Sequence, residues 1–391
     1  MRSSQISQAL AAAVKMSILV TLFCSSPAWA GSGRAIFNLP ANPESGLVSD
    51  ASGNLYGAAR YGSTDLVYKL SPVGPSYWKF TVVHSFDPAT EGDLLSSTLV
   101  FDSAGNLYGT TQAGGPNGFG TVFRLSPGPQ GWSETTLYVF AGGDGCYSDG
   151  VVMDHAGNLF GAAKDCGGGD QQGLIFELSP VDNGFWTETI LYNSQELELQ
   201  TPLAIDSAGN LYGGVETGVY RVHPNSDGTW TTRYIHEFSD LDGFSPLGQM
   251  MIDAAGNLYG TNQTGGPNRC GTAFKMTPVP SGNWTFQVLH GFGDDLPWFI
   301  DGIYPGTSLV LDNAGNVFGN TVGGGPDDLG TIFKLSPGPK NTWVESARYS
   351  FTGGTDGSTP IGNLLLQSGK FYGVTALGGR WNAGEVFEFT P

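Results

Sequence analysis

Three aspartates occupy matching positions in this chain, and their side chains are of the type that holds metal ions. Asp242, Asp301 and Asp356 each precede a glycine shortly before a short apolar segment. Asp149 shares the Asp-Gly pair, and Asp93 is a looser equivalent. Carboxylate oxygens are the ligands that Ca²⁺ and Mg²⁺ prefer, so converging aspartates would form a cation site. The alternative is that Asp-Gly is an ordinary turn dipeptide here.

Aromatic side chains form the second candidate site. Six of the nine tryptophans begin the same strand-like segment in successive repeats and are expected to be structural: Trp78, Trp132, Trp186, Trp230, Trp284 and Trp343. Trp298 and Trp381 depart from this pattern, and Trp298 precedes Phe299 in the longest insertion. Exposed aromatic rings stack on sugars or anchor protein partners. We therefore predict ligand binding by Trp298, Phe299, Trp381 and Tyr147, unless Trp298 only covers its own loop.

The cysteines and histidines give no metal-binding pattern. Cys146 and Cys166 lie in two loops of one repeat and are the predicted disulfide, with no histidine beside them at ligand spacing. His84, His236 and His290 each stand two residues before a phenylalanine, where other repeats have tyrosine. Such a shared position predicts packing rather than chemistry. No cofactor is therefore expected to be required, and Ca²⁺ at the aspartates is the one candidate ion.

The phrase Asp-x-x-Gly-Asn-Leu-Tyr-Gly recurs about every 50 residues and organises the whole sequence. Its copies begin at Asp50, Asp102, Asp154, Asp206, Asp253 and Asp312, with a degenerate seventh at Leu366. A residue that all repeats share is expected to serve the scaffold, because each repeat is one structural unit. The aspartate is predicted to accept backbone N–H bonds within a hairpin turn. A calcium loop would need several acids, and each turn has one.

One repeat contains four strand-like segments. In the second copy they cover residues 97–102, 106–111, 121–125 and 132–140, each rich in β-branched or aromatic residues and bounded by turn residues. Four strands per unit and seven units predict an all-β, seven-bladed β-propeller of four-stranded antiparallel blades. The last repeat lacks a fourth strand, and residues 34–39 resemble one. The N-terminal strand is therefore expected to complete the last blade and close the ring.

Antiparallel order assigns the loops to two faces. The Asp-x-x-Gly-Asn turns and the Ser-Pro turns lie on one face, called the bottom. The loops between the second and third strands and the connections between blades lie on the other, called the top, where variable loops predict binding. In the fourth repeat the loop shrinks to residues 215–218, which predicts a notch in the top rim.

Residues 1–30 differ from the rest of the chain. Arg2 and Lys15 precede an apolar segment at residues 16–23, and Ala28-Trp29-Ala30 is a small-x-small cleavage signal. We predict a secretory signal peptide over residues 1–30 and a single propeller domain over residues 31–391, with seven repeats of about 52 residues. The product is expected to be secreted or associated with the cell surface, and not transmembrane after cleavage.

The charge is strongly acidic, with a net value of −18, and the predicted signal peptide contains two basic and no acidic residues. So acidic a surface argues against nucleic acid as a partner. The chain contains no Gly-x-Ser-x-Gly, no His-Glu-x-x-His and no phosphate-binding loop. Whether the protein is an enzyme is left open by the sequence, although catalysis is the less favoured interpretation.

The sequence resembles a known family at its most regular segments. Gly-Asn-Leu-Tyr-Gly-Thr-Thr, then Gly-Gly, then Gly-Thr-Val-Phe-Arg-Leu-Ser-Pro, at residues 105–127, is similar to the GloVer tandem repeat, and residues 315–337 match it as well. This repeat defines the choice-of-anchor tandem repeat GloVer-containing proteins of bacteria. The resemblance implies an exported, often surface-attached repeat protein, with no established activity or catalytic residues.

These observations lead to one function and two alternatives. The first is a monomeric binding or scaffold module that recognises an extracellular glycan or protein through its top face. The second is a propeller-type enzyme, a lyase, lactonase or glycan hydrolase, that uses acids at the mouth of the channel with or without a divalent cation. The third is a purely structural envelope protein. Convergence of Asp242, Asp301 and Asp356 around a pocket would favour the enzyme.

Overall fold

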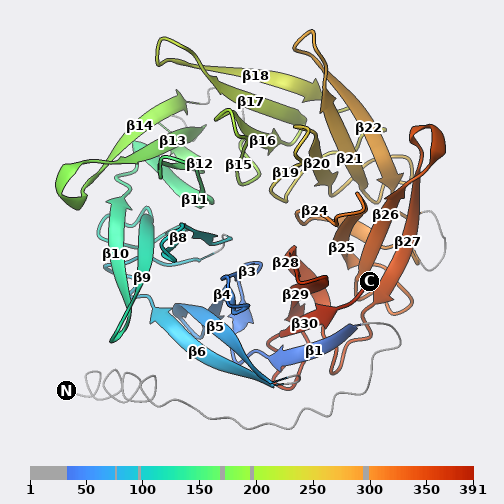
Figure 1. Ribbon diagram of the computed structural model, residues 1–391, viewed down its shortest axis with the longest axis horizontal. Coiled ribbons are helices and arrows are strands. Elements are labelled where there is room, and N and C mark those ends of the chain that lie inside the picture. Colours follow the sequence, from blue (N-terminus) through green and yellow to red (C-terminus); the bar gives the residue numbers. More distant parts are fainter. Residues whose placement is uncertain (1–32, 75–76, 96–97, 168–171, 194–197, 294–298) are drawn as a thin grey trace.

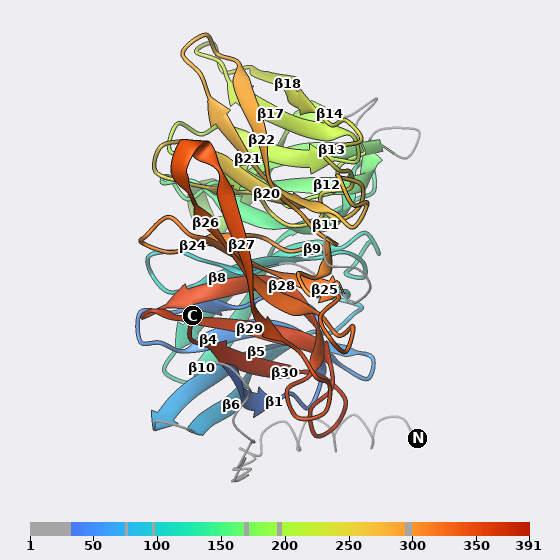
Figure 2. The ribbon, with the colours of Figure 1, turned by 90° about the vertical axis from the view of Figure 1, so that its right-hand side faces the viewer.

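A computed structural model describes residues 33–391 of the protein, except residues 75–76, 96–97, 168–171, 194–197 and 294–298. Within this part, the chain forms β-strands and turns, with two short 3-10 segments, η1 (Asp182–Gly184) and η2 (Pro339–Asn341). Seven antiparallel sheets stand around a central opening (Figure 1), and Figure 2 shows the same ring from the side. No helix among the described residues has the length and apolar character needed to cross a bilayer.

The blades follow one another along the chain, each beginning with its innermost strand. Blade 1 contains β2 (Asn42–Pro43), β3 (Val48–Ser49), β4 (Leu55–Tyr61), β5 (Thr64–Gly74) and β6 (Tyr77–Ser85). Blade 2 contains β7 (Val100–Phe101), β8 (Leu107–Thr111), β9 (Thr121–Gly128) and β10 (Gly131–Val139). Blade 3 contains β11 (Asp144–Met153), β12 (Leu159–Gly167), β13 (Gln172–Pro180) and β14 (Trp186–Asn193).

The second half of the ring repeats this order. Blade 4 contains β15 (Ala204–Ile205), β16 (Leu211–Val215), β17 (Gly218–Pro224) and β18 (Trp230–Glu237). Blade 5 contains β19 (Met251–Ile252), β20 (Leu258–Asn262), β21 (Thr272–Pro278) and β22 (Trp284–Gly291). Blade 6 contains β23 (Ile303–Pro305), β24 (Val310–Leu311), β25 (Val317–Gly323), β26 (Thr331–Pro337) and β27 (Trp343–Ser350). Blade 7 contains β28 (Ser358–Gln367), β29 (Lys370–Leu377), β30 (Glu385–Phe389) and β1 (Gly33–Asn38).

The ring closes in blade 7, where the two ends of the chain meet. β1 pairs antiparallel with β30, with Gly33 opposite Phe389, and is the outermost strand of the sheet (Figure 1). Across this junction Arg34 Nε donates to Glu388 Oε1 at 3.1 Å. The predicted fold, a seven-bladed propeller closed by the N-terminal strand, is confirmed.

The hydrophobic core of the described residues consists of seven clusters, each between two neighbouring blades. In one cluster Phe371 of blade 7 packs with Phe318 of blade 6. In another, Val374 of blade 7 packs with Leu55 of blade 1. Each sheet therefore buries both of its faces, and the stability of a blade depends on both of its neighbours.

The Asp-x-x-Gly-Asn phrase forms the turn between the first and second strands. In blade 5, Asp253 Oδ1 accepts from the backbone N–H groups of Ala255 and Asn257, both at 2.9 Å. Its Oδ2 accepts from the Asn257 side chain at 2.7 Å and from the Tyr259 hydroxyl at 3.2 Å. Burial opposes ionisation, but these bonds outweigh it and hold the pKa of Asp253 below its ordinary value. The aspartate is a structural acceptor, as predicted.

The remaining residues of the phrase join one blade to the next. The tyrosine of one blade packs edge-on against the tryptophan of the following blade, as Tyr56 does with Trp132 at 5.8 Å between ring centroids. The glycine lies under an aromatic ring of the third strand, and a Cβ atom on Gly373 would lie 2.3 Å from Phe387 Cζ. Only glycine fits there. The phrase is shared because every blade needs the same turn, the same close approach and the same inter-blade contact.

Replacement of Asp253 by alanine is expected to destabilise the protein by about 2 kcal/mol, because several donors lose a charged acceptor. The pKa of Asp253 is lower in the folded protein than in the unfolded chain, so this contribution is present at neutral pH and is lost as the pH falls through the lowered value. Denaturant unfolding at pH 7 measures the change. Asp182→Ala, at an exposed bottom-face position, is the control. Equal stabilities for the two variants would contradict the structural role of the phrase.

Candidate functional site

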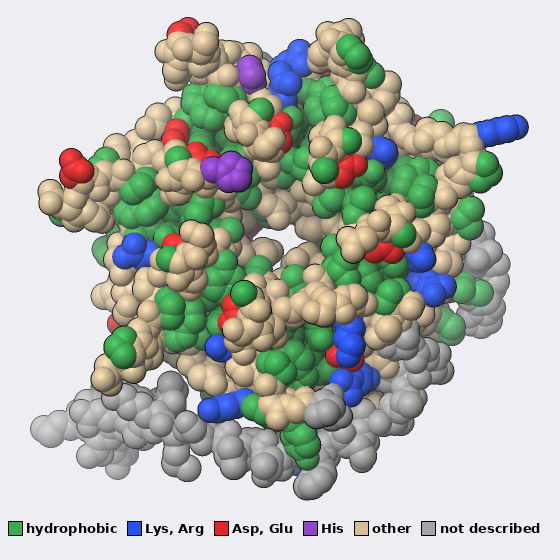
Figure 3. Space-filling model, in the orientation of Figure 1, with side chains coloured by type: hydrophobic (Ala, Val, Ile, Leu, Met, Phe, Trp, Pro, Cys, Tyr) green, Lys and Arg blue, Asp and Glu red, His purple; other side chains and the backbone are tan. Residues whose placement is uncertain are grey.

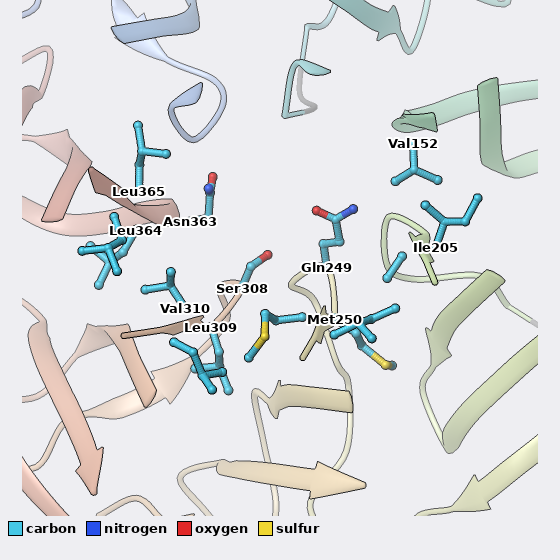
Figure 4. A pocket seen from close by; sticks show the side chains of 15 residues that line it. Val152, Ile205, Gln249, Met250, Ser308, Leu309, Val310, Asn363, Leu364 and Leu365 are labelled. Carbon is cyan, nitrogen blue, oxygen red and sulfur yellow. The ribbon is translucent and has the colours of Figure 1, made fainter. Parts of the chain in front are cut away.

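The central channel contains a cavity with a volume of about 590 Å³. Its lining comes from the innermost strands of blades 3 to 7 and is mainly aliphatic. Figure 4 shows Gln249, Ser308 and Asn363, the polar members of the lining, around the open centre. No carboxylate lines this cavity. This cavity therefore presents an apolar wall with a few neutral polar groups.

The three aspartates predicted to bind a cation lie in separate connections between blades, and each has partners in its own connection. Each carboxylate lies beside the ring of the histidine or tyrosine near the end of the preceding fourth strand. The contacts are His236 Nε2 to Asp242 Oδ2 at 3.2 Å, His290 Nε2 to Asp301 Oδ2 at 3.0 Å, and Tyr349 OH to Asp356 Oδ2 at 2.9 Å. A backbone N–H also donates to each of these Oδ2 atoms.

The carboxylates of Asp242, Asp301 and Asp356 therefore do not meet the condition of convergence that would favour a shared cation site. Among the described residues, one group of three or more acidic, histidine or cysteine side chains has its ligand atoms within 4.8 Å of one another: Cys146, Asp165 and Cys166. Asp242, Asp301 and Asp356 form no such group. Each carboxylate instead stabilises its own turn between blades, which agrees with the alternative that Asp-Gly is an ordinary turn dipeptide here.

The alignment of acids between repeats must be corrected. Glu91 and Asp144 are the structural counterparts of Asp242, because Glu91 Oε2 lies 2.8 Å from His84 Nε2 and Asp144 Oδ2 lies 2.6 Å from Tyr138 OH. We call this feature, an acid followed by glycine and bonded to a ring of the fourth strand, the acid–glycine turn. Its members are Glu91, Asp144, Asp242, Asp301 and Asp356.

Asp93 and Asp149, the equivalents expected from sequence, have other partners. Asp93 Oδ1 accepts from Arg60 Nη2 at 2.7 Å, and Asp149 Oδ1 accepts from the Gln112 side chain at 2.5 Å. Lys164 also forms an ion pair with Asp149. Both aspartates thus belong to local polar networks.

Four blades share one form of top-face loop, which we call the Gly-Gly loop. The loops are Gly114–Gly120, Gly265–Gly271, Gly324–Gly330 and Gly378–Gly384 in blades 2, 5, 6 and 7. In each, both leading glycines have positive φ, and the second donates its N–H to a carbonyl of the incoming connection. The acceptors are Pro88, Asp240, Phe299 and Gly354, at 2.8, 2.9, 2.9 and 2.8 Å respectively. The top face is therefore built from paired loops.

The Gly-Gly loop of blade 7 departs from the other three at the two positions after the glycines. The others have proline followed by asparagine or aspartate, whereas blade 7 has Arg380 and Trp381. In blades 2 and 5 the side chains of Asn117 and Asn268 donate to a backbone carbonyl near the end of the fourth strand, at 3.0 and 3.1 Å. Trp381 replaces this short amide, and its side chain is 48% exposed.

Arg380 and Trp381 form a pair. The Arg380 guanidinium carbon lies 5.5 Å from the centroid of the Trp381 ring, within the range of a cation–π contact. The Arg380 backbone N–H donates to the Asn38 side chain, which anchors the loop to the end of β1. The result is an exposed indole with a positive charge beside it, held on a fixed loop. Such a surface can stack on a sugar ring and donate hydrogen bonds to its oxygens.

The other predicted aromatic residues are placed differently. Trp298 lies outside the described residues. Phe299 is half-buried, and its carbonyl accepts from Gly302 at 2.8 Å and from Gly325 at 2.9 Å, so its backbone belongs to the paired loops of blade 6. Tyr147 is 46% exposed on the top face.

Tyr147 belongs to a set that sequence reasoning missed. The third residue after the acid of each acid–glycine turn has a positive φ although it is not glycine, a rare conformation. These residues and φ values are Leu94 64°, Tyr147 53°, Ser245 58°, Tyr304 58° and Thr359 56°. Tyr304 is 43% exposed and is the equivalent of Tyr147. Its fixed distance from Asp301 in the sequence is the signal that would have identified it.

Two further observations complete the top face. Cys146 and Cys166, the pair proposed from sequence, are joined in a disulfide that links β11 to β12 in blade 3. The loop of blade 4 is a tight turn between β16 and β17, as expected, but blade 1 has an equally short turn between β4 and β5. Among the loops that the structure describes, the rim is therefore lowered at blade 1 as well as at blade 4. Tyr61, 59% exposed, stands at the turn of blade 1.

Charge does not gather into one patch on the face that Figure 3 shows. This is the bottom face, which carries the hairpins between the third and fourth strands, and its acidic and basic side chains are scattered among apolar ones around a central opening (Figure 3).

These features define the class as a closed, seven-bladed propeller made of tandem repeats with a variable top face. The chain belongs to the Gloeobacter/Verrucomicrobia repeat family, whose sequence profile matches residues 35–221 and 214–391. The family resemblance seen in the sequence is thereby confirmed. Among curated proteins, none matches the chain.

Solved structures with similar folds support the architecture. Virginiamycin B lyase from Staphylococcus aureus is 13% identical, with a TM-score of 0.58 over 92% of this chain and 98% of the lyase. A streptogramin B lyase is 14% identical, with a TM-score of 0.58 over 93% and 99% of the two chains. A protein from Lactobacillus plantarum is 14% identical, with a TM-score of 0.52 over 80% and 87%. At these identities the similarity concerns the fold alone.

Proposed function

We propose that the protein is an exported binding module that recognises an extracellular glycan through the top face of its propeller, with Trp381 and Arg380 at the centre of the site. One observation carries this proposal. In a loop whose other three copies have proline and then a short polar residue, blade 7 presents an exposed tryptophan and an arginine. The scaffold does not require this change, because the Gly-Gly loop forms without it in blades 2, 5 and 6.

The chemistry of the pair favours a carbohydrate. An indole face binds the C–H face of a sugar, and the guanidinium beside it can donate to hydroxyl or carboxylate oxygens. Leu377, at the end of the strand that enters this loop, and Tyr61, at the short turn of blade 1, are also exposed. Export is part of the proposal. The leader expected at residues 1–30 and the disulfide between Cys146 and Cys166 support it, because disulfides persist in oxidising compartments.

The enzymatic alternative has less support. The lyases with the same fold share 13–14% identity with this chain, which concerns the architecture. The carboxylates proposed for catalysis, Asp242, Asp301 and Asp356, each hold a local turn instead of facing a shared pocket.

A binding screen tests the proposal. The mature protein is applied to immobilised peptidoglycan, chitin, cellulose, xylan and pectin. A variant receives the corresponding residues of blade 2, as R380P/W381N/N382G. Retention of the parent protein on at least one polysaccharide, and its loss in the variant, is the expected result. The control, D327N/D328R, gives the loop of blade 6 the residues of blade 5 and is expected to be retained.

Two outcomes would overturn the proposal. One is no retention of the parent on any polysaccharide of the panel. The other is equal retention of the parent and the R380P/W381N/N382G variant. Because both variants exchange residues that the same loop accepts elsewhere in the ring, thermal melting is expected to show intact folding in both.

A further inference from the structure

Glu385 is a fully buried acid directly beneath the proposed binding loop. It is the first residue of β30 and follows Gly384, the last residue of the loop that carries Trp381. Its exposed fraction is 0%, and neither of its carboxyl oxygens has a hydrogen-bond partner. An ionised carboxylate without a partner is very costly to bury. The position therefore favours the neutral, protonated acid.

Glu385 occupies a strand position where three other blades have threonine. Blades 2, 5 and 6 have threonine there, at Thr121, Thr272 and Thr331. Thr121 Oγ1 donates to the Glu91 carbonyl and Thr272 Oγ1 to the Asp242 carbonyl, both at 2.6 Å. In blades 2 and 5 the hydroxyl thus fastens the third strand to the acid–glycine turn. A carboxylate has no proton to donate in this place, whereas a carboxylic acid has one.

The surroundings of Glu385 are acidic or neutral. The pKa of Glu385 is raised to about 8, first by burial and then by the nearby carboxylate of Asp356, which is itself 3% exposed. Tyr349, which donates to Asp356, also has a raised pKa, from burial first and then from Asp356 and Glu385. The strand neighbours of Glu385 are Asn38 in β1 and Thr375 in β29, both uncharged.

The one cation in the adjoining loop has other contacts. Arg380 stacks on Trp381, and it is not among the groups that shift the pKa of Glu385. Among the described residues, no basic group lowers the pKa of Glu385.

We propose that Glu385 is a proton switch beneath the Trp381 loop. As a neutral acid it is tolerated in its buried position between the loop Gly378–Gly384 and the acid–glycine turn at Asp356, and when it gives its proton to solvent the buried charge destabilises the packing of these two segments. The backbone bond from Gly379 to the Gly354 carbonyl, 2.8 Å long, joins the same two segments and would be weakened with it. Glycan retention by the Trp381 loop is therefore expected to fall at alkaline pH, and this consequence rests on the proposed function. The switch itself does not.

The direction of the pH effect follows from proton binding. The pKa of Glu385 is about 8 in the folded protein, against an ordinary value of 4.5. Between these values the folded protein holds one more proton than the unfolded chain, so stability falls as the pH rises. The contribution of the neutral acid is fully present below the ordinary value and is lost as the pH passes through about 8. Glutamine at this position keeps a donor and does not titrate.

The test compares the mature protein with Glu385→Gln and Glu385→Thr, without any ligand. Thermal unfolding is measured from pH 5 to pH 9, and hydrogen exchange of residues 378–384 is measured at pH 6 and pH 9. The parent is expected to melt at the same temperature as Glu385→Gln near pH 5, and several degrees lower at pH 9. At pH 9 the loop of the parent is expected to exchange faster than the loop of Glu385→Gln, whereas at pH 6 the two loops are expected to exchange at the same rate.

Parallel melting curves and equal loop exchange in the parent and Glu385→Gln would overturn the proposal. Glu385→Thr restores the residue of blades 2, 5 and 6, so it provides the comparison if glutamine prevents folding. A carbon-13 titration of the Glu385 carboxyl, assigned by its absence in the variant, gives an independent reading. An ordinary acidic midpoint would contradict the switch. No ligand enters these measurements, so their failure is distinct from failure of the glycan proposal.

Discussion

Deletion of residues 1–39 is expected to abolish cooperative folding of the propeller. The deletion removes β1, so β30 becomes an unpaired edge in blade 7. It also removes Ala35 and Leu39, which are buried in the two clusters on either side of that blade. Loss of a buried leucine alone costs about 2–5 kcal/mol. Whole domains are stable by only about 5–15 kcal/mol. An open ring is therefore not expected to persist.

Urea unfolding followed by tryptophan fluorescence measures this effect. The control is a chain that begins at Gly31, which retains β1 and is expected to unfold in one sharp transition. Addition of a peptide covering residues 31–39 is expected to restore part of the stability of the truncated chain, because a strand can add to an exposed sheet edge. A truncated chain with the midpoint and cooperativity of the control would contradict closure by β1.

Replacement of Trp381 by alanine is expected to weaken glycan binding about 30-fold, the loss of about 2 kcal/mol that marks a central aromatic contact. The folded structure is expected to remain, because the side chain is 48% exposed and its loop is held by backbone bonds of Gly379 and Gly384. Trp381→Phe is expected to keep part of the affinity, since a smaller ring still stacks.

The polysaccharide retained in the screen serves as the probe for this measurement, in its soluble form, by calorimetry. The matched control is Val344→Ala, which alters a side chain that is 61% exposed on the outer strand β27 of blade 6. Its affinity is expected to equal that of the parent. Equal affinities for the parent and Trp381→Ala would remove Trp381 from the site.

The architecture was predictable because the repeat encodes contacts that every blade needs. Asp253 fixes its own turn, Gly373 admits the ring of Phe387, and Tyr56 meets Trp132 of the next blade. These requirements act at fixed spacing, so they leave a periodic trace in the sequence. Closure was predictable for the same reason, since a missing fourth strand at one end was matched by a strand at the other.

The acids were not predictable in the same way. Asp149 is followed by glycine, as the pattern requires, but the acid–glycine turn of that blade is at Asp144. The connections between blades differ in length, so sequence spacing does not identify the equivalent position there. Hydrogen bonds to His84, Tyr138 or their counterparts identify it instead.

Two residues of the candidate site show how far a site can be found by looking for residues that depart from the repeat. Trp381 could be found because it breaks the pattern of the tryptophans. Its significance depended on the structure, which shows that Asn117 and Asn268 make a bond at the same place. Glu385 could not be found, because its position becomes meaningful only when its burial and its alignment with Thr121 are known.

The central claim is that the repeats build the scaffold and that the departure in blade 7 binds the ligand. Oxidative footprinting of the mature protein, with and without the retained polysaccharide, tests it most directly, because side-chain oxidation reports exposure residue by residue. We predict strong protection of Trp381 and of neighbouring top-face residues such as Leu377, with no change at the bottom-face residues Val181 and Phe185. Protection of the bottom face, with Trp381 oxidised equally in both samples, would contradict the claim.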